Sequence, residues 1–209
     1  MLNEAVTAFI TFFVVIDPIG LAPLFVALTQ GASSAARRRI AVTAVLVGAG
    51  IIAVFGLVGE ALLAFLGISL AAFRISGGLL LFLIALDMVF ERRTQRREEK
   101  TGAGERAPEH DPSVFPLATP LIAGPGAIAT IILLMGRHQG DLAGQAVVLG
   151  VALAVLALAL VMFLLGGLIE RVLRRTGILV VTRLLGILLA ALSVQFVLDG
   201  LAGVGALPR

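Results

Sequence analysis

The chain has 209 residues, 59% of them hydrophobic and 14% charged, with a mean hydropathy of +1.10. An ordinary globular domain of this composition could not stay dissolved, so we expect an integral membrane protein that is not an enzyme. The absence of Cys excludes disulfides and thiolate sites, and His110 and His138 lie far apart, so we expect neither metal nor cofactor. The net charge of +3 comes from arginines in short connections, which argues against nucleic acid as a partner.

Six apolar stretches are long enough to cross a hydrocarbon core about 30 Å thick. They run over 5–28, 40–66, 70–90, 114–135, 142–169 and 178–204. The first stretch opens Met-Leu-Asn-Glu without a cationic region, so we interpret it as an uncleaved span rather than a signal peptide. Residues 91–113 are charged and rich in Gly and Glu, which predicts a linker between two halves.

The cations predict how the chain is oriented in the membrane. Thirteen of the sixteen Lys and Arg residues fall on one side of the predicted spans, and only Arg74, Arg137 and Arg209 fall on the other. Because positive charge is enriched in cytoplasmic loops, we expect a multi-pass protein of the bacterial inner (plasma) membrane with the N and C termini outside and the linker in the cytoplasm.

The sequence contains a weak copy of itself. Pro18-Ile-Gly-Leu-Ala-Pro23 is followed 102 residues later by Pro120-Leu-Ile-Ala-Gly-Pro125, and Arg74-Ile-Ser-Gly resembles Arg183-Leu-Leu-Gly at an offset of 109. Each half holds three predicted spans, and an odd number inverts the second half relative to the first. We therefore predict an all-α protein with a first three-helix repeat (1–90), a cytoplasmic linker (91–113) and a second, inverted repeat (114–209).

The first predicted span contains an acidic residue about twelve residues from its start. Asp17 precedes Pro18, and this pair has the chemistry of a helix N-cap followed by the first helical position. We expect the helix to stop near Ile16 and to restart at Pro18. Pro23 would then leave the carbonyl of Ile19 without its helical donor.

The fourth predicted span repeats this pattern, with Thr119 as the cap and Pro120 as the first helical position. Pro125 would free another carbonyl, and its neighbours Gly124 and Gly126 would let backbone approach backbone or a small ligand. Two breaks at matching positions of inverted halves should meet near the bilayer centre, because irregular backbone is tolerated there only inside protein or beside a polar cavity.

The two breaks predict a binding site for a small zwitterion. A half-helix N-terminus suits a carboxylate, whereas freed carbonyls and the Asp17 side chain suit an ammonium group, Na⁺ or a proton. The candidate substrate-binding residues are Asp17, Pro18, Gly20, Pro23, Thr119, Pro120, Gly124, Pro125 and Gly126. The competing interpretation is that the breaks are packing kinks and that Asp17 serves only as a cap.

These two segments resemble the paired signatures of the MarC family of bacterial and archaeal inner-membrane proteins. The resemblance rests on Asp17-Pro18-Ile-Gly-Leu-Ala-Pro23 and on Thr119-Pro120-Leu-Ile-Ala-Gly124-Pro125-Gly126, and it spans essentially the whole chain. It implies two inverted three-helix repeats with interrupted first and fourth helices. SnatA-like members imply transport of small neutral amino acids such as alanine and glycine with proton coupling.

Three classes of function compete. A secondary transporter working by alternating access, in symport with a proton or Na⁺, is favoured by the repeats and the broken helices. The alternative is a channel, or an exporter of another small metabolite. An intramembrane enzyme is disfavoured because no metal-ligand spacing and no Gly-x-Ser-x-Gly sequence is present. The expected partners are a small-molecule substrate and the lipid bilayer, and self-association into an oligomer is compatible with the sequence.

Overall fold

The computed structural model describes residues 2–90 and 112–206, and all regular elements in these two ranges are helical. The helices are α1 (Leu2–Ile16), α2 (Pro18–Leu28), α3 (Ser34–Phe65), α4 (Leu70–Val89), η1 (Ser113–Ile122), α6 (Pro125–Met135), η2 (Gly136–His138), α7 (Leu142–Leu164) and α8 (Gly166–Gly203). Five helical segments are long and apolar enough to cross a membrane, and a bent pair of helices brings the number to as many as six. The predicted all-α membrane protein is confirmed at this level, whereas most of the predicted linker, 91–111, lies outside the described residues.

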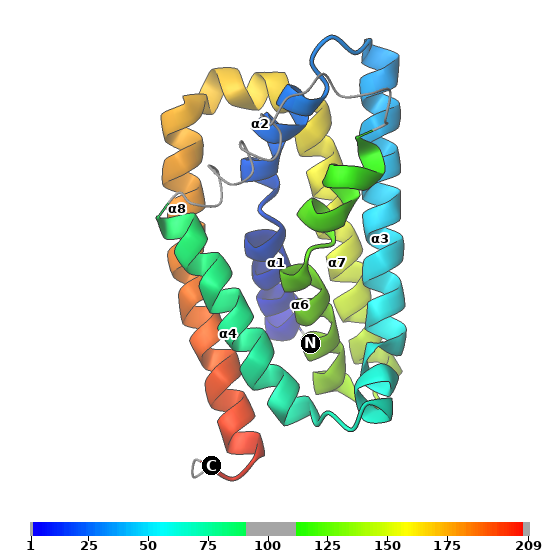
Figure 1. Ribbon diagram of the computed structural model, residues 1–209, viewed down its shortest axis with the longest axis vertical. Coiled ribbons are helices and arrows are strands. Elements are labelled where there is room, and N and C mark those ends of the chain that lie inside the picture. The colour runs from blue at the N-terminus through cyan, green and yellow to red at the C-terminus, as the bar shows by residue number, and fades with distance from the viewer. Residues whose placement is uncertain (1, 91–111, 207–209) are drawn as a thin grey trace.

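The fifth predicted span was too long. It was expected to run to Ile169, but α7 ends at Leu164 and α8 begins two residues later. The first part of α8 lies across one end of the bundle, and the chain turns at Arg174, where φ is 51° (Figure 1). The span itself covers Thr176–Gly203. Arg171 and Arg174 explain the shortening, because charged side chains are costly in the hydrocarbon layer.

Helices of one half pack against helices of the other half. In chain order, each half has a broken helix followed by two long helices, and α4 packs against α8, whereas α3 contacts η1, α6 and α7, and α1 contacts α6, α7 and α8. Figure 1 shows α4 and α8 running side by side along one edge of the bundle. The pairing of α4 with α8 is compatible with a twofold relation between the halves, and the inverted repeat itself stays a prediction.

The α4–α8 contact depends on small residues. A Cβ atom at Gly78 would lie 2.8 Å from the backbone oxygen of Ser193, and one at Gly200 would lie 2.9 Å from the backbone oxygen of Ala71. The two contacts are seven residues apart on each helix. Because the residue number falls from Gly78 to Ala71 on α4 while it rises from Ser193 to Gly200 on α8, the two helices are antiparallel. Glycine therefore allows the two backbones to approach closely, as is common between membrane helices.

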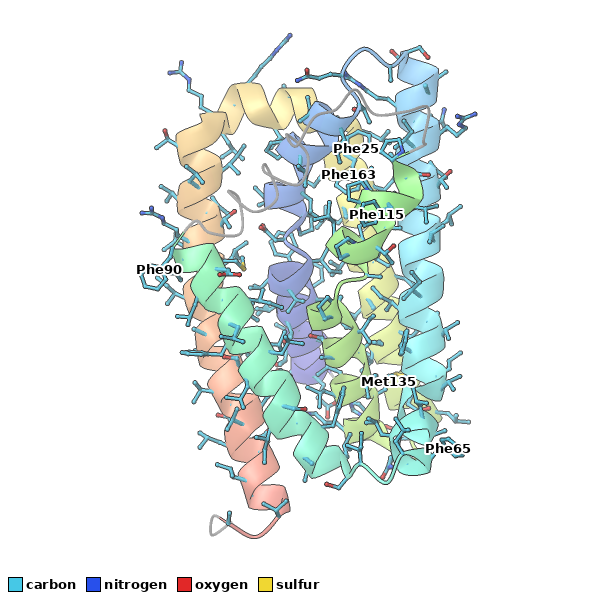
Figure 2. All side chains as sticks on the ribbon, viewed as in Figure 1. Phe25, Phe65, Phe90, Phe115, Met135 and Phe163 are labelled. Carbon is cyan, nitrogen blue, oxygen red and sulfur yellow. The ribbon has the colours of Figure 1, made fainter. Side chains whose placement is uncertain are left out.

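Apolar side chains fill the interior and also cover the outside of the bundle. Phe25 of α2 stacks on Phe163 of α7 with ring centroids 4.8 Å apart, and Met135 is buried (Figure 2). Phe65 and Phe90 are 87% and 62% exposed and project outward. Large exposed apolar surface indicates contact with lipid.

Candidate functional site

The break between α1 and α2 consists of one residue. Asp17 has φ 54° and ψ 63°, which is left-handed helical geometry. Its backbone N–H donates to the Phe13 carbonyl at 2.9 Å, and its own carbonyl accepts from the Leu21 N–H at 3.0 Å. The predicted stop at Ile16 and restart at Pro18 are confirmed, but the two pieces still form one candidate span over 2–28.

The Asp17 side chain caps α2 as predicted. Its Oδ1 atom accepts a hydrogen bond from the Gly20 N–H at 3.1 Å, and the residue is completely buried. A Cβ atom at position 20 would overlap the Asp17 carboxylate, so the cap requires glycine there. A fully buried acidic residue within a membrane span is costly, and such residues mark functional sites by default.

Three carbonyl groups around this cap lose the amides that would serve them in an unbroken helix. Pro18 and Pro23 have no N–H to offer the carbonyls of Val14 and Ile19. The Gly20 N–H, which would serve the Ile16 carbonyl, points at Asp17 instead. The first break therefore concentrates oxygen atoms, namely one carboxylate and several carbonyls, within little more than one helical turn.

The second break is longer than the predicted one. The backbone of η1 is non-helical at Phe115 and at Thr119, and Thr119 does not cap a helix, since its hydroxyl donates to the Val114 carbonyl at 3.1 Å. The α-helix restarts at Pro125, with Gly124 as the N-cap. The predicted interruption at Thr119 is therefore present, with φ −126° and ψ 125°, but the regular α-helix begins only at Pro125, which starts a helix rather than interrupting one. The bend between the two parts is 53°.

The two breaks lie beside each other. A Cβ atom at Gly126, in the first turn of α6, would lie 3.2 Å from the Val15 side chain, two residues before Asp17. Figure 1 shows both breaks at about the same level of the bundle. Asp17, Pro18, Gly124 and Gly126 are buried, Gly20, Pro23 and Thr119 are half-buried, and Pro120 and Pro125 are exposed. The exposed prolines are therefore poor candidates for an enclosed site.

Gly126 is in contact with apolar side chains. Besides Val15, an added Cβ atom would meet Ile84 at 2.7 Å and Leu81 at 3.4 Å. A larger residue at position 126 would thus disturb the packing of α6 against α1 and α4. Its expected role in ligand approach stays a prediction.

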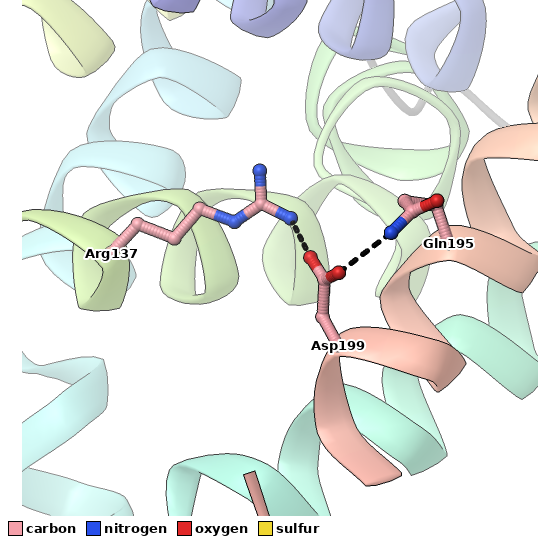
Figure 3. Close-up of polar contacts among 3 residues, drawn as sticks. All are labelled: Arg137, Gln195 and Asp199. Atoms are coloured by element: carbon pink, nitrogen blue, oxygen red, sulfur yellow. Dashed lines mark hydrogen bonds and ion pairs between the residues drawn. The ribbon is translucent and has the colours of Figure 1, made fainter. Parts of the chain in front are cut away.

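Sequence reasoning missed a group of polar residues near the start of α1. Asn3, Glu4 and Thr7 line a cavity together with Arg137 and His138 from the end of the fourth span. Arg137 is also held by the sixth span, since its Nη2 atom donates to Asp199 Oδ2 at 2.5 Å and Gln195 Nε2 donates to Asp199 Oδ1 at 2.7 Å (Figure 3). The sequence pattern that could have indicated this group is the four-residue spacing of Asn3, Thr7 and Thr11, which places three polar residues on one face of the helix.

Comparison with known proteins agrees with the helical plan. The family described as MarC family integral membrane protein matches residues 2–204. The UPF0056 membrane protein YhcE of Escherichia coli strain K12 is 35% identical over 94% of this chain and 91% of its own length. YvbG of Bacillus subtilis is 36% identical over 97% and 96%, and a UPF0056 membrane protein of Aquifex aeolicus is 38% identical over 94% and 91%. No solved structure matches. A match over nearly the whole length, with relatives covered almost end to end, means that the chain belongs to the MarC family of integral membrane proteins.

Proposed function

We propose that this protein is a secondary transporter of small neutral amino acids, or of similar small zwitterions, across the inner membrane. The observation that carries the proposal is the fully buried Asp17 at a break in the first span, directly beside the second break. Inverted-repeat transporters bind substrate between two such discontinuous helices.

The two half-helices offer complementary charges to a zwitterion. Around Asp17, the carboxylate and the carbonyls of Val14 and Ile19 suit an ammonium group. Across the contact with Val15, α6 begins at Pro125, and its N-cap Gly124 has no side chain for capping. The first amides of α6 and the positive end of its helix dipole therefore suit a carboxylate.

Protonation of Asp17 would couple transport to a proton gradient. A protonated carboxyl group is a weaker acceptor than a carboxylate, so its hydrogen bond to the Gly20 N–H would weaken and the start of α2 would loosen. Substrate and proton would in this way act on the same hinge, which is what symport by alternating access requires.

Uptake by purified protein in liposomes tests the proposal. Labelled glycine, alanine, serine and leucine are offered with and without an inward proton gradient, and an ionophore that collapses the gradient serves as control. We expect saturable uptake of the small neutral amino acids that the gradient accelerates. Uptake that rises linearly with concentration would indicate a channel, and no uptake of any amino acid in either direction would refute the proposed substrate class.

A further inference from the structure

A cavity of about 250 Å³ lies where α1 begins and the fourth span ends. Its polar wall is formed by Asn3, Glu4, Thr7, Arg137 and His138, and Leu134 and Val148 contribute apolar surface. The volume equals that of about eight water molecules at roughly 30 Å³ each, and it is below the ~300–1,000 Å³ of sites for drug-sized ligands. The cavity therefore suits a solute of a few heavy atoms.

Arg137 is the fixed cation of this cavity. The Asp199 carboxylate holds it at 2.5 Å, and its guanidinium carbon lies 5.0 Å from the centre of the Phe196 ring. A guanidinium group has five N–H donors, and the hydrogen bond to Asp199 is made by Nη2 alone. Donors thus remain for a carboxylate in the cavity, and the anchored side chain has little freedom left to lose on binding.

The other charges near the cavity favour an anion at Arg137 rather than at His138. Arg74 lies within electrostatic range of Arg137 and Asp199 and adds a second positive charge. His138 Nδ1 lies 3.5 Å from Asp141 Oδ2, and the backbone amide of Gly144 lowers the pKa of the Asp141 carboxyl. Glu4, which is exposed and already has another interaction in the structure, provides the negative charge on the α1 side of the cavity.

Further threonine residues of α1 and α6 lie in sequence between this cavity and the two breaks. Thr7 and Thr11 follow Asn3 at steps of four residues, so all three share one face of α1, and Thr11 is fully buried. On α6, Thr130 lies midway between Gly126, which faces Val15, and Leu134, which lines the cavity.

Thr130 is also fully buried, and its hydroxyl has no hydrogen-bond partner in the described part of the chain. Burying a hydroxyl group without a partner is unfavourable. A polar solute or water between α1 and α6 would satisfy it.

We propose that the cavity is a subsite for a small zwitterion, in which Arg137 binds the carboxylate, Glu4 and Thr7 bind the ammonium group, and Thr130 receives the solute on its way to Asp17. This inference rests on the proposed transport function, because the polar residues of α1 and α6 lead from the cavity toward the two breaks. It adds a binding site at the other ends of α1 and α6, away from the breaks.

Protection of an introduced cysteine tests the inference, since the native chain has none. Thr7→Cys is reacted in detergent solution with a positively charged methanethiosulfonate, with or without glycine. Leu142→Cys, 82% exposed at the start of α7 and outside the cavity, is the control. We expect glycine to slow labelling at position 7 but not at 142, and glycinamide, which has no carboxylate, to give no protection.

The role of Arg137 is tested in the same assay. Adding Arg137→Gln should raise the glycine concentration for half-protection by about tenfold to hundredfold, the usual effect of losing charge-assisted hydrogen bonds. Asp199→Asn breaks the same ion pair but keeps the guanidinium group, so we expect a clearly smaller effect. Equal losses in the two variants would mean that Arg137 only holds helices together, and would overturn the assignment.

Calorimetric titration of the parent chain with glycine gives a second readout if the cysteine variant folds poorly. No heat of binding together with no protection would overturn the subsite. Uptake into liposomes separates the two proposals. If glycine protects the cysteine at position 7 but no uptake occurs, the subsite proposal stands and the transporter proposal is refuted. If uptake occurs and Arg137→Gln leaves it unchanged, only the subsite proposal is refuted.

Discussion

Substitutions of Asp17 separate its structural role from its chemical role. The residue does three things at once: it adopts φ 54°, its Oδ1 atom caps α2 through the Gly20 N–H at 3.1 Å, and it carries a carboxyl group in a fully buried position. Asn can adopt left-handed geometry and caps as well as Asp. Gly keeps the backbone geometry but loses the cap, and Ala loses both.

The expected stabilities follow from these losses. Asp17→Asn should be close to the parent, and Asp17→Gly should be less stable by about 1 kcal/mol for the lost cap. Asp17→Ala adds the cost of left-handed geometry, about 1–2 kcal/mol, for a total of about 2–3 kcal/mol with the cap. For a chain of this length, that total corresponds to a fall in Tm of about 4–12 °C.

Two measurements on the same preparations check this ranking. Thermal unfolding in detergent gives the Tm, and uptake into liposomes is expressed per amount of folded protein. We expect Asp17→Asn to keep the Tm and lose most proton-driven uptake. If the Asp17→Ala variant were as stable as the Asp17→Asn variant, neither the left-handed backbone geometry nor the cap would contribute to stability. If Asn transported like the parent over the whole pH range, Asp17 would be a cap and nothing more.

Four further expected results concern three glycines and the membrane topology. Gly20→Ala should lower the Tm much as Asp17→Gly does, because the added methyl group overlaps the capping carboxylate. Gly78→Ala should destabilise the protein by about 1 kcal/mol, since overpacking of about 1–3 kcal/mol exceeds the gain in helix propensity. Gly150→Ala, with open space around it, should instead raise the Tm slightly. An impermeant maleimide added to intact cells should label Leu142→Cys but not Ala35→Cys, and the reverse pattern would contradict the orientation deduced from the arginines.

The first break could be predicted from the sequence because adjacent residues encode it. Asp17 followed by Pro18 supplies a cap and a fixed φ, and no distant contact is needed to stop α1 at Ile16. The left-handed geometry of Asp17 could not be predicted, since the residue before a proline generally prefers extended backbone. That geometry lets α2 continue nearly in line with α1.

The second break and the cavity depend on contacts that local sequence does not contain. Both Thr119-Pro120 and Gly124-Pro125 are suitable helix starts by sequence. The α-helix that starts at Pro125 is the one in which Gly126 packs against Val15 and Leu81, and these contacts are distant in sequence. The ion pair of Arg137 with Asp199 joins residues 62 positions apart, from different spans. From sequence, Asp199 was indistinguishable from an interfacial residue at a span end.

The position of the second restart changes which residues of the two halves are equivalent. The sequence match pairs Pro18 with Pro120, at an offset of 102. In the structure, Pro18 and Pro125 each begin a half-helix of 11 residues, so a repeat defined by these helix starts would have an offset of 107. The counterpart of Asp17 is then Gly124, and one half-helix start is capped by a carboxylate while the other is open. One carboxyl group at one break and one uncapped helix start at the other is the asymmetry that the proposed zwitterionic substrate, with one positive and one negative end, would require.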